Sequence, residues 1–125
     1  MNFDADVLIW AMRGNRAAAQ AVQDEPVREL SVVAYMELVS GARDKADLQG
    51  IQAFVSDLAF RVLPLSEGIG SLAAKYMEEH GLVIGMDPAD ALIAATAVEN
   101  RLPLCTGNYR HYRLIRELQV KPFKP

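Results

Sequence analysis

The amino-acid sequence predicts an α/β fold with a mostly parallel central sheet flanked by helices. Short apolar runs rich in β-forming residues recur along the chain, and longer segments with helical spacing separate them. Of the 125 residues, 51% are hydrophobic, which is enough for one core. The chain contains no repeat, low-complexity stretch or Ser/Gly linker. We therefore expect residues 1–125 to form a single domain.

Five short runs are predicted as strands because they are apolar and bounded by turn or helix signals. They are residues 1–3, 29–33, 60–63, 102–106 and 119–121. Longer helix-like segments separate them. Strands that alternate with helices in this way pair in parallel.

The intervening segments carry helix signals. Apolar stripes predict helices at residues 7–12, 17–22, 34–42 and 46–58. Ser66 is expected to open a fifth helix that Gly81 ends, so that His80 caps its last turn. The clearest start is Asp87-Pro88, a capping acid followed by proline at the first helical position, ahead of an Ala-rich run to residue 100.

Charge is sorted along the chain. The formal net charge of -3 gives no general argument for a polyanion-binding protein. Residues 101–125, however, hold six basic residues and one acid, so this segment carries +5 and residues 1–100 carry -8. The single cysteine, Cys105, excludes an intrachain disulfide and a cysteine-based zinc site. The acidic amino terminus lacks a signal-peptide pattern, so we expect a cytoplasmic protein with no membrane span.

Three acids follow predicted strands or open a helix. Asp4 follows the first strand, Glu37 lies in the first turns after the second, and Asp90 lies in the first turn of its helix. Each has apolar neighbours and no Lys or Arg beside it, so a hard divalent cation is the natural counter-charge. Taken singly, each acid could instead be a helix cap, a helix-dipole acid or an exposed helix residue. Asp6 and Asp87 are assigned to such structural roles.

Four segments resemble the PIN-domain nucleases and, within them, the VapC-type toxins of bacterial toxin–antitoxin pairs. They are Phe-Asp-Ala-Asp-Val-Leu-Ile at 3–9, Ser-Val-Val-Ala-Tyr-Met-Glu-Leu-Val-Ser-Gly at 31–41, Asp-Ala-Leu-Ile-Ala-Ala-Thr-Ala at 90–97 and Leu-Pro-Leu-Cys-Thr-Gly-Asn at 102–108. Any one of these segments is common, but the four in this order and spacing are specific. The resemblance covers nearly the whole chain.

The resemblance implies a three-layer PIN-like fold and a magnesium- or manganese-dependent endoribonuclease. Asp4, Glu37 and Asp90 match the acidic positions of the family, whereas the fourth position is Asn108 and a further, sometimes acidic, position is His111. Asn108 can ligate a cation through its carbonyl oxygen or hold a metal-bound water, but it adds no charge. The resemblance also implies a VapB-like antitoxin partner and a homodimer.

Other residues near the fourth motif have a functional and a structural interpretation. Thr106 either orients a neighbour by hydrogen bonding or simply ends a strand. The arginines at 110, 113 and 116 would share one face if this segment is helical, and they could bind RNA phosphates or form a solvated surface. Tyr109 and Tyr112 could stack on bases or pack.

Two other classes of protein are weighed against the nuclease. A response-regulator receiver has a similar size and a Lys-Pro-Phe segment like the one at 121–123, but here no final strand and helix follow it, and Asp57 lies in a helical pattern. A PIN-like RNA- or protein-binding module without catalysis remains open because of Asn108. A nuclease assay with and without magnesium distinguishes these classes.

Overall fold

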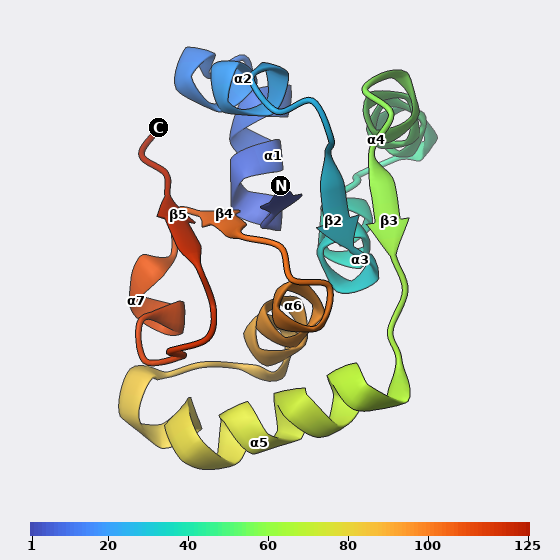
Figure 1. The fold of residues 1–125 in the computed structure, drawn as a ribbon. Helices are drawn as coiled ribbons and strands as arrows, with labels where there is room; N and C mark the ends of the chain where they lie inside the picture. Colours follow the sequence, from blue (N-terminus) through green and yellow to red (C-terminus); the bar gives the residue numbers. More distant parts are fainter.

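The computed structural model describes all residues 1–125 and has a five-stranded parallel sheet at its centre (Figure 1). The strand order is β3-β2-β1-β4-β5, and every neighbouring pair is parallel. The strands are β1 (Asn2–Phe3), β2 (Glu29–Ser31), β3 (Arg61–Leu63), β4 (Leu104–Thr106) and β5 (Val120–Pro122). The predicted α/β class and parallel sheet are confirmed.

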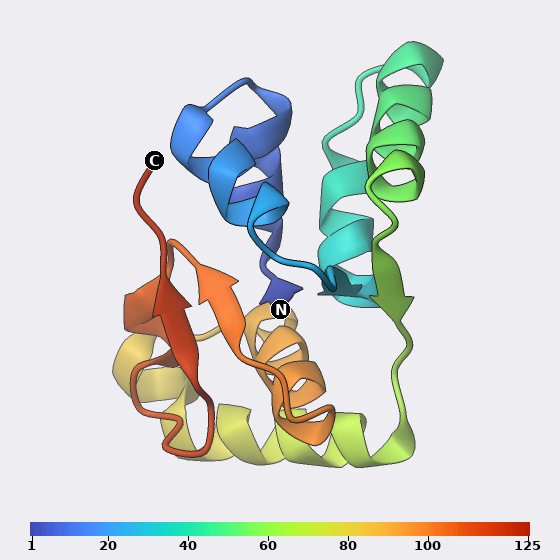
Figure 2. The same cartoon turned by 45° about the horizontal axis from the view of Figure 1, so that its top comes forward.

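Helices cover both faces of the sheet and form the outer two of three layers (Figures 1 and 2). They are α1 (Ala5–Met12), α2 (Arg16–Gln23), α3 (Val32–Ser40), α4 (Lys45–Asp57), α5 (Glu67–Ile84), α6 (Pro88–Glu99) and α7 (Tyr109–Tyr112). The first four helices lie on one side, and α5 and α6 pack against each other on the other side. This division follows from right-handed crossovers that run first in one direction along the sheet and then back past β1.

Side-chain caps set most helix starts where the sequence predicts them. Ser66 accepts from Ile69 N–H at the start of α5, and Asp87 forms a capping box with Asp90 at the start of α6. The second strand ends earlier than expected because the Ser31 side chain accepts from the Val33 N–H. That cap places the last two residues of the predicted strand in α3.

The end of α5 corrects the sequence prediction. The helix runs past Gly81 to Ile84 and ends at Gly85, whose φ of 67° is the left-handed conformation that glycine adopts most readily. Gly81 stays inside the helix, where a glycine costs about 1 kcal/mol, and the end of the Met77 side chain covers it. His80 is therefore an internal helix residue beside Glu79 and Tyr76 and does not cap the helix.

The basic segment also differs from the expected helical face. Helix α7 ends at Tyr112, so Arg110 is helical, Arg113 only caps the helix and Arg116 lies beyond it. The reason is packing: Ile115 and Leu118 are buried, which turns the chain back into the core before β5. The three arginines do not share one face of a helix.

One hydrophobic cluster of 27 buried residues connects the sheet to the helices on both sides. Four buried alanines of α6 allow this helix to pack closely between the sheet and α5; they are Ala91, Ala94, Ala95 and Ala97. None of the helices has the length and hydrophobicity needed to cross a membrane.

Candidate active site

The candidate site lies at the carboxyl ends of the central strands. β1 pairs with β2 on one side and with β4 on the other. The chain adds β2 and β3 on one side of β1 and then returns to add β4 and β5 on the other side, so the strand order has a switch point between β1 and β4. Ligands of open α/β sheets bind at such a switch point, outside the carboxyl ends of the strands. Asp4 directly follows β1, and Thr106 is the last residue of β4.

Asp4 is 4% exposed and holds three hydrogen bonds. Its Oδ1 accepts from the Ala5 N–H at 2.8 Å, and its Oδ2 accepts from Thr106 Oγ1 at 2.8 Å and Tyr112 Oη at 3.1 Å. The prediction that Thr106 orients a neighbour is confirmed. Burial, followed by the charge of Asp6, raises the pKa of Asp4 to about 6 despite these bonds.

Asp90 reaches the same point from the first turn of α6. Its Oδ2 accepts from the Asp87 N–H at 3.2 Å, and its Oδ1 is 3.3 Å from Tyr112 Oη. The pKa of Asp90 is raised, mainly by burial and then by the charge of Asp87, which outweigh the hydrogen bond to the backbone. His111 Nδ1 lies 3.2 Å from Asp90 Oδ2 but is not aligned to hydrogen-bond with it.

Tyr112 is the residue that connects the two acids, and the sequence analysis does not include it among the residues of the metal site. Its side chain is fully buried, and its hydroxyl lies between Asp4 and Asp90. Burial and the two neighbouring carboxylates raise the pKa of Tyr112, so it stays a neutral hydrogen-bond donor. The sequence offers no direct signal for this contact, because Tyr112 belongs to the late motif region only as an aromatic that could pack or stack.

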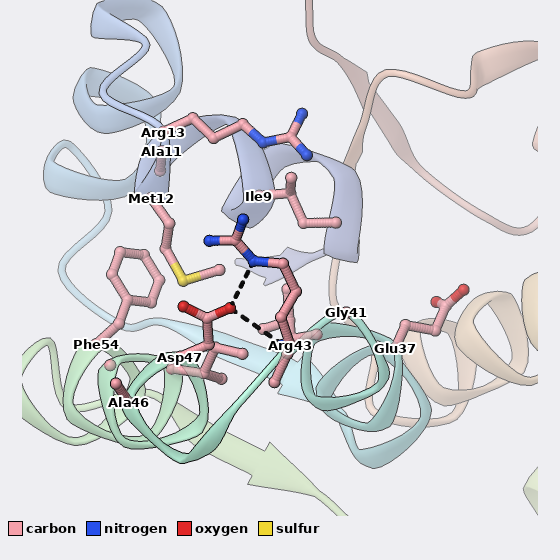
Figure 3. Close-up of a pocket in the computed structure, with 14 residues that line it drawn as sticks. Ile9, Ala11, Met12, Arg13, Glu37, Gly41, Arg43, Ala46, Asp47 and Phe54 are labelled. Carbon is pink, nitrogen blue, oxygen red and sulfur yellow. Dashed lines mark hydrogen bonds and ion pairs between the residues drawn. The ribbon is translucent and has the colours of Figure 1, made fainter.

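Glu37 approaches the site from the second turn of α3. Partial burial, followed by the charges of Asp4 and Asp90, raises the pKa of this otherwise exposed carboxyl to about 7. Figure 3 shows its carboxylate pointing away from Arg43 and Asp47, which line a groove of about 880 Å³ between α1, α3 and α4. Neither Lys nor Arg pairs with Asp4, Glu37 or Asp90.

Asp6 has the structural role predicted for it. Its Oδ1 accepts from the Val7 N–H and its Oδ2 from the Gly107 N–H, each at 2.8 Å. These bonds connect the first turn of α1 to the loop after β4. A Cβ at position 107 would lie 2.6 Å from Asp6 Oδ2, so the close approach of this loop requires glycine.

The remaining candidate residues follow β4 in the sequence, and the last of them, Arg116, lines a small separate cavity with Tyr76 and Glu117. Asn108 precedes α7, its side chain makes no capping hydrogen bond, and its N–H donates to Thr106 Oγ1 at 3.0 Å. Arg110, Arg113 and Arg116 are exposed, and none forms an ion pair with a carboxylate of the chain. The structure thus brings Asp4 and Asp90 together, places Glu37 within their electrostatic influence and leaves the arginines on the surface.

The carboxylate oxygens near the site are the kind of ligand that a divalent cation such as Mg²⁺ prefers. Asp4, Asp6, Glu37 and Asp90 are hard oxygen donors, and burial is the main cause that raises the pKa of each. No group of three acidic, His or Cys side chains is gathered closely enough to enclose an ion in this conformation. An ion here therefore requires adjustment of side chains around the pair that Tyr112 already joins.

Comparisons with known proteins agree with this arrangement. Residues 1–117 match the PIN domain family. Two relatives from Mycobacterium tuberculosis are Ribonuclease VapC19, 31% identical over 93% of this chain and 94% of the relative, and Ribonuclease VapC10, 36% identical over 93% and 88%. A chain in a toxin–antitoxin complex from Klebsiella pneumoniae superposes with a TM-score of 0.83 at 28% identity, covering 99% of this chain and 98% of that one. VapBC2 from Rickettsia felis shares the fold, with a TM-score of 0.81 at 17% identity over 98% of each chain. With this sheet order, these acids at the strand ends and these relatives, the chain belongs to the PIN domain family.

Proposed function

We propose that the chain is a divalent-metal-dependent endoribonuclease that hydrolyses RNA phosphodiester bonds and acts as the toxin of a type II toxin–antitoxin pair. The observation that carries this proposal is the meeting of Asp4 and Asp90 around Tyr112, with Glu37 nearby and neither Lys nor Arg paired with these acids. Two relatives that match over nearly the whole chain are VapC ribonucleases. We take residues 1–125 to be one PIN domain.

Asp4, Glu37 and Asp90 are the proposed metal ligands, with Asn108 at the fourth position. A bound Mg²⁺ or Mn²⁺ would activate a water molecule and neutralise charge on the scissile phosphate. The Ala5 N–H and Thr106 hydroxyl orient the Asp4 carboxylate, and the Asp87 N–H orients Asp90. These fixed donors remove the need to order the carboxylates at the moment of reaction.

RNA binding is proposed for the exposed arginines that follow the loop after β4. The acids repel a polyanion, so positive charge close to them is needed to hold the phosphate backbone. Arg110 lies in α7, next to His111 and Tyr112, and Arg113 and Arg116 follow on the exposed surface. Because none of the three is neutralised by an ion pair, all three are available to phosphates.

The proposed partners are a VapB-like antitoxin and a second copy of the chain. The Klebsiella pneumoniae relative, with 28% identity, is part of a toxin–antitoxin complex. Structures of VapBC from Salmonella typhimurium and VapBC-1 from Haemophilus influenzae share this fold. Co-expression with the product of an adjoining short gene, followed by purification on a tag on one of the two proteins, tests the antitoxin directly.

Cleavage of labelled RNA in chelator, Mg²⁺ and Mn²⁺ tests the activity. We expect cleavage in at least one of the metals and none in chelator. Asp90→Asn should abolish cleavage while keeping the fold, because an asparagine Oδ1 can still accept from the Asp87 N–H but the ion loses a charge. Asp57→Asn at the exposed end of α4 is the matched control and should cleave like the parent. Full activity of folded Asp90→Asn would contradict the metal-site assignment.

The alternative function is a PIN-like binding module without catalysis. Asn108 favours it, because this side chain supplies no negative charge at the fourth position. This alternative predicts RNA or protein binding with no cleavage in either metal. The same assay therefore separates the two functions.

A further inference from the structure

The buried hydroxyl of Tyr112 lies between two acids that are far apart in the sequence. Asp4 directly follows β1 and Asp90 lies in the first turn of α6, and the only side chain that hydrogen-bonds to both is Tyr112. Its side chain is fully buried at the end of α7 and belongs to the hydrophobic core. A side chain in this place cannot act on the RNA directly, so any effect on catalysis passes through the acids.

We propose that Tyr112 is a positioning residue that sets the relative placement of the Asp4 and Asp90 carboxylates for divalent-cation binding. The inference rests on the proposed metal site and adds to it a residue outside the acidic set. Two unpaired carboxylates at close range repel each other and separate. A hydroxyl within 3.1 Å of Asp4 Oδ2 and 3.3 Å of Asp90 Oδ1 opposes this separation, because its proton can serve either oxygen.

The hydrogen bonds also limit how Asp4 can contact an ion. A carboxylate has about four lone-pair positions, and Asp4 commits two of them to Ala5 and Thr106 and a third to Tyr112 when the hydroxyl proton points to Asp4. In that arrangement Asp4 has about one position left for an ion. Loss of the Tyr112 hydroxyl would free a second position and permit the Asp4 side chain to rotate toward a different geometry.

The test is Tyr112→Phe, which removes the hydroxyl and keeps the buried ring. Tyr76→Phe is a matched control: Tyr76 is 2% exposed, and its hydroxyl also donates to a carboxylate, that of Glu117, away from the site. Calorimetric titration with Mn²⁺ should show an affinity at least about ten-fold weaker for Tyr112→Phe, the usual effect of losing a partner that orients metal ligands. The Tyr76→Phe affinity should match that of the parent.

Kinetics of RNA cleavage add a second readout. We expect kcat of Tyr112→Phe to decrease by about the same factor as the metal affinity at sub-saturating Mn²⁺, with KM for RNA unchanged. An unchanged Mn²⁺ affinity in Tyr112→Phe, or a tighter one, overturns the proposal. Equal losses in Tyr112→Phe and Tyr76→Phe also overturn it, because the effect would then be structural.

A measurement on the unsubstituted protein covers the case in which Tyr112→Phe does not fold. The four tyrosines can be labelled at ¹³Cζ and followed by NMR during titration with Mg²⁺. The Tyr112 resonance should move with the ion and the Tyr76 resonance should not; a Tyr112 resonance that stays in place while the ion binds overturns the inference. If the parent binds the ion but does not cleave RNA, the proposed function fails while the role of Tyr112 stands on the binding data.

Discussion

Folding stability of the metal-free protein should decrease as pH rises, and Asp4 should cause much of the decrease. Burial raises the pKa of this carboxyl from 3.8 to about 6. Between these values the folded chain keeps a proton that the unfolded chain releases, so deprotonation favours unfolding. Stability from this group is complete below pH 3.8 and is lost as the pH rises through about 6. Two pKa units at about 1.36 kcal/mol each give a loss of about 3 kcal/mol.

The substitution Asp4→Asn removes the charge and keeps much of the hydrogen bonding. An asparagine Oδ1 can accept from the Ala5 N–H, and the Thr106 and Tyr112 hydroxyls can accept from its amide as well as donate. In chelator at about pH 8, the variant should be more stable than the parent by up to about 3 kcal/mol, and this advantage should disappear at about pH 4. Urea titrations at several pH values measure both quantities.

The Asp57→Asn protein is the control, because this residue at the end of α4 is exposed and its side chain has no hydrogen bond or ion pair with the acids of the site. It should follow the pH dependence of the parent. Added Mg²⁺ at about one hundred times its Kd should stabilise the parent by about 2.7 kcal/mol and leave Asp4→Asn unchanged. If Asp4→Asn and the parent lose stability equally between about pH 4 and pH 8, deprotonation of Asp4 is not the cause of the loss of folding stability.

Three further substitutions test the surrounding residues. Asn108→Asp should tighten Mn²⁺ binding by adding an anionic ligand, and an unchanged affinity in calorimetry would place this exposed side chain outside the ligand set. Replacing Arg110, Arg113 and Arg116 with Gln should weaken RNA binding and reduce its salt dependence by up to about three phosphate contacts, whereas parent-like affinity at every salt concentration would make these arginines a solvated surface. Asp6→Asn should cost less cleavage activity than Asp90→Asn, because Asp6 hydrogen-bonds to the Gly107 backbone; equal losses would assign Asp6 to the metal site.

Local patterns were sufficient for most of the fold, and long-range packing explains the differences. The caps at Ser66 and Asp87 can be read from a few adjacent residues, because a side-chain oxygen satisfies the nearby backbone N–H groups. The end of α5 could not be predicted from adjacent residues, because Gly81 and Gly85 are both suitable stop signals. The contact between Gly81 and the Met77 side chain exists only in the folded helix. The condition for a shared face of three arginines, a helix through residues 110–116, is not met for the same reason, because burial beyond α7 ends that helix early.

The candidate site divides in the same way. Asp4 and Asp90 were predicted because strand ends and helix starts are visible in the sequence, and parallel strands bring their carboxyl ends to one edge. The contact of Tyr112 with Asp4 was not predicted, because it joins residues more than one hundred positions apart and depends on where the hydroxyl of a buried side chain lies. A sequence pattern shows that an aromatic side chain is present but does not locate its hydroxyl.

The structural and functional interpretations of Asp4 apply together. Asp4 does cap α1, and it accepts three hydrogen bonds, yet its pKa stays at about 6. Hydrogen bonds to a carboxylate lower its pKa, so a value this high means that they do not compensate for burial. At neutral pH the folded protein therefore retains an electrostatic cost at this position that no cation of its own relieves. A divalent ion would remove that cost on binding, so the helix-capping role of Asp4 and its proposed role as a metal ligand are compatible.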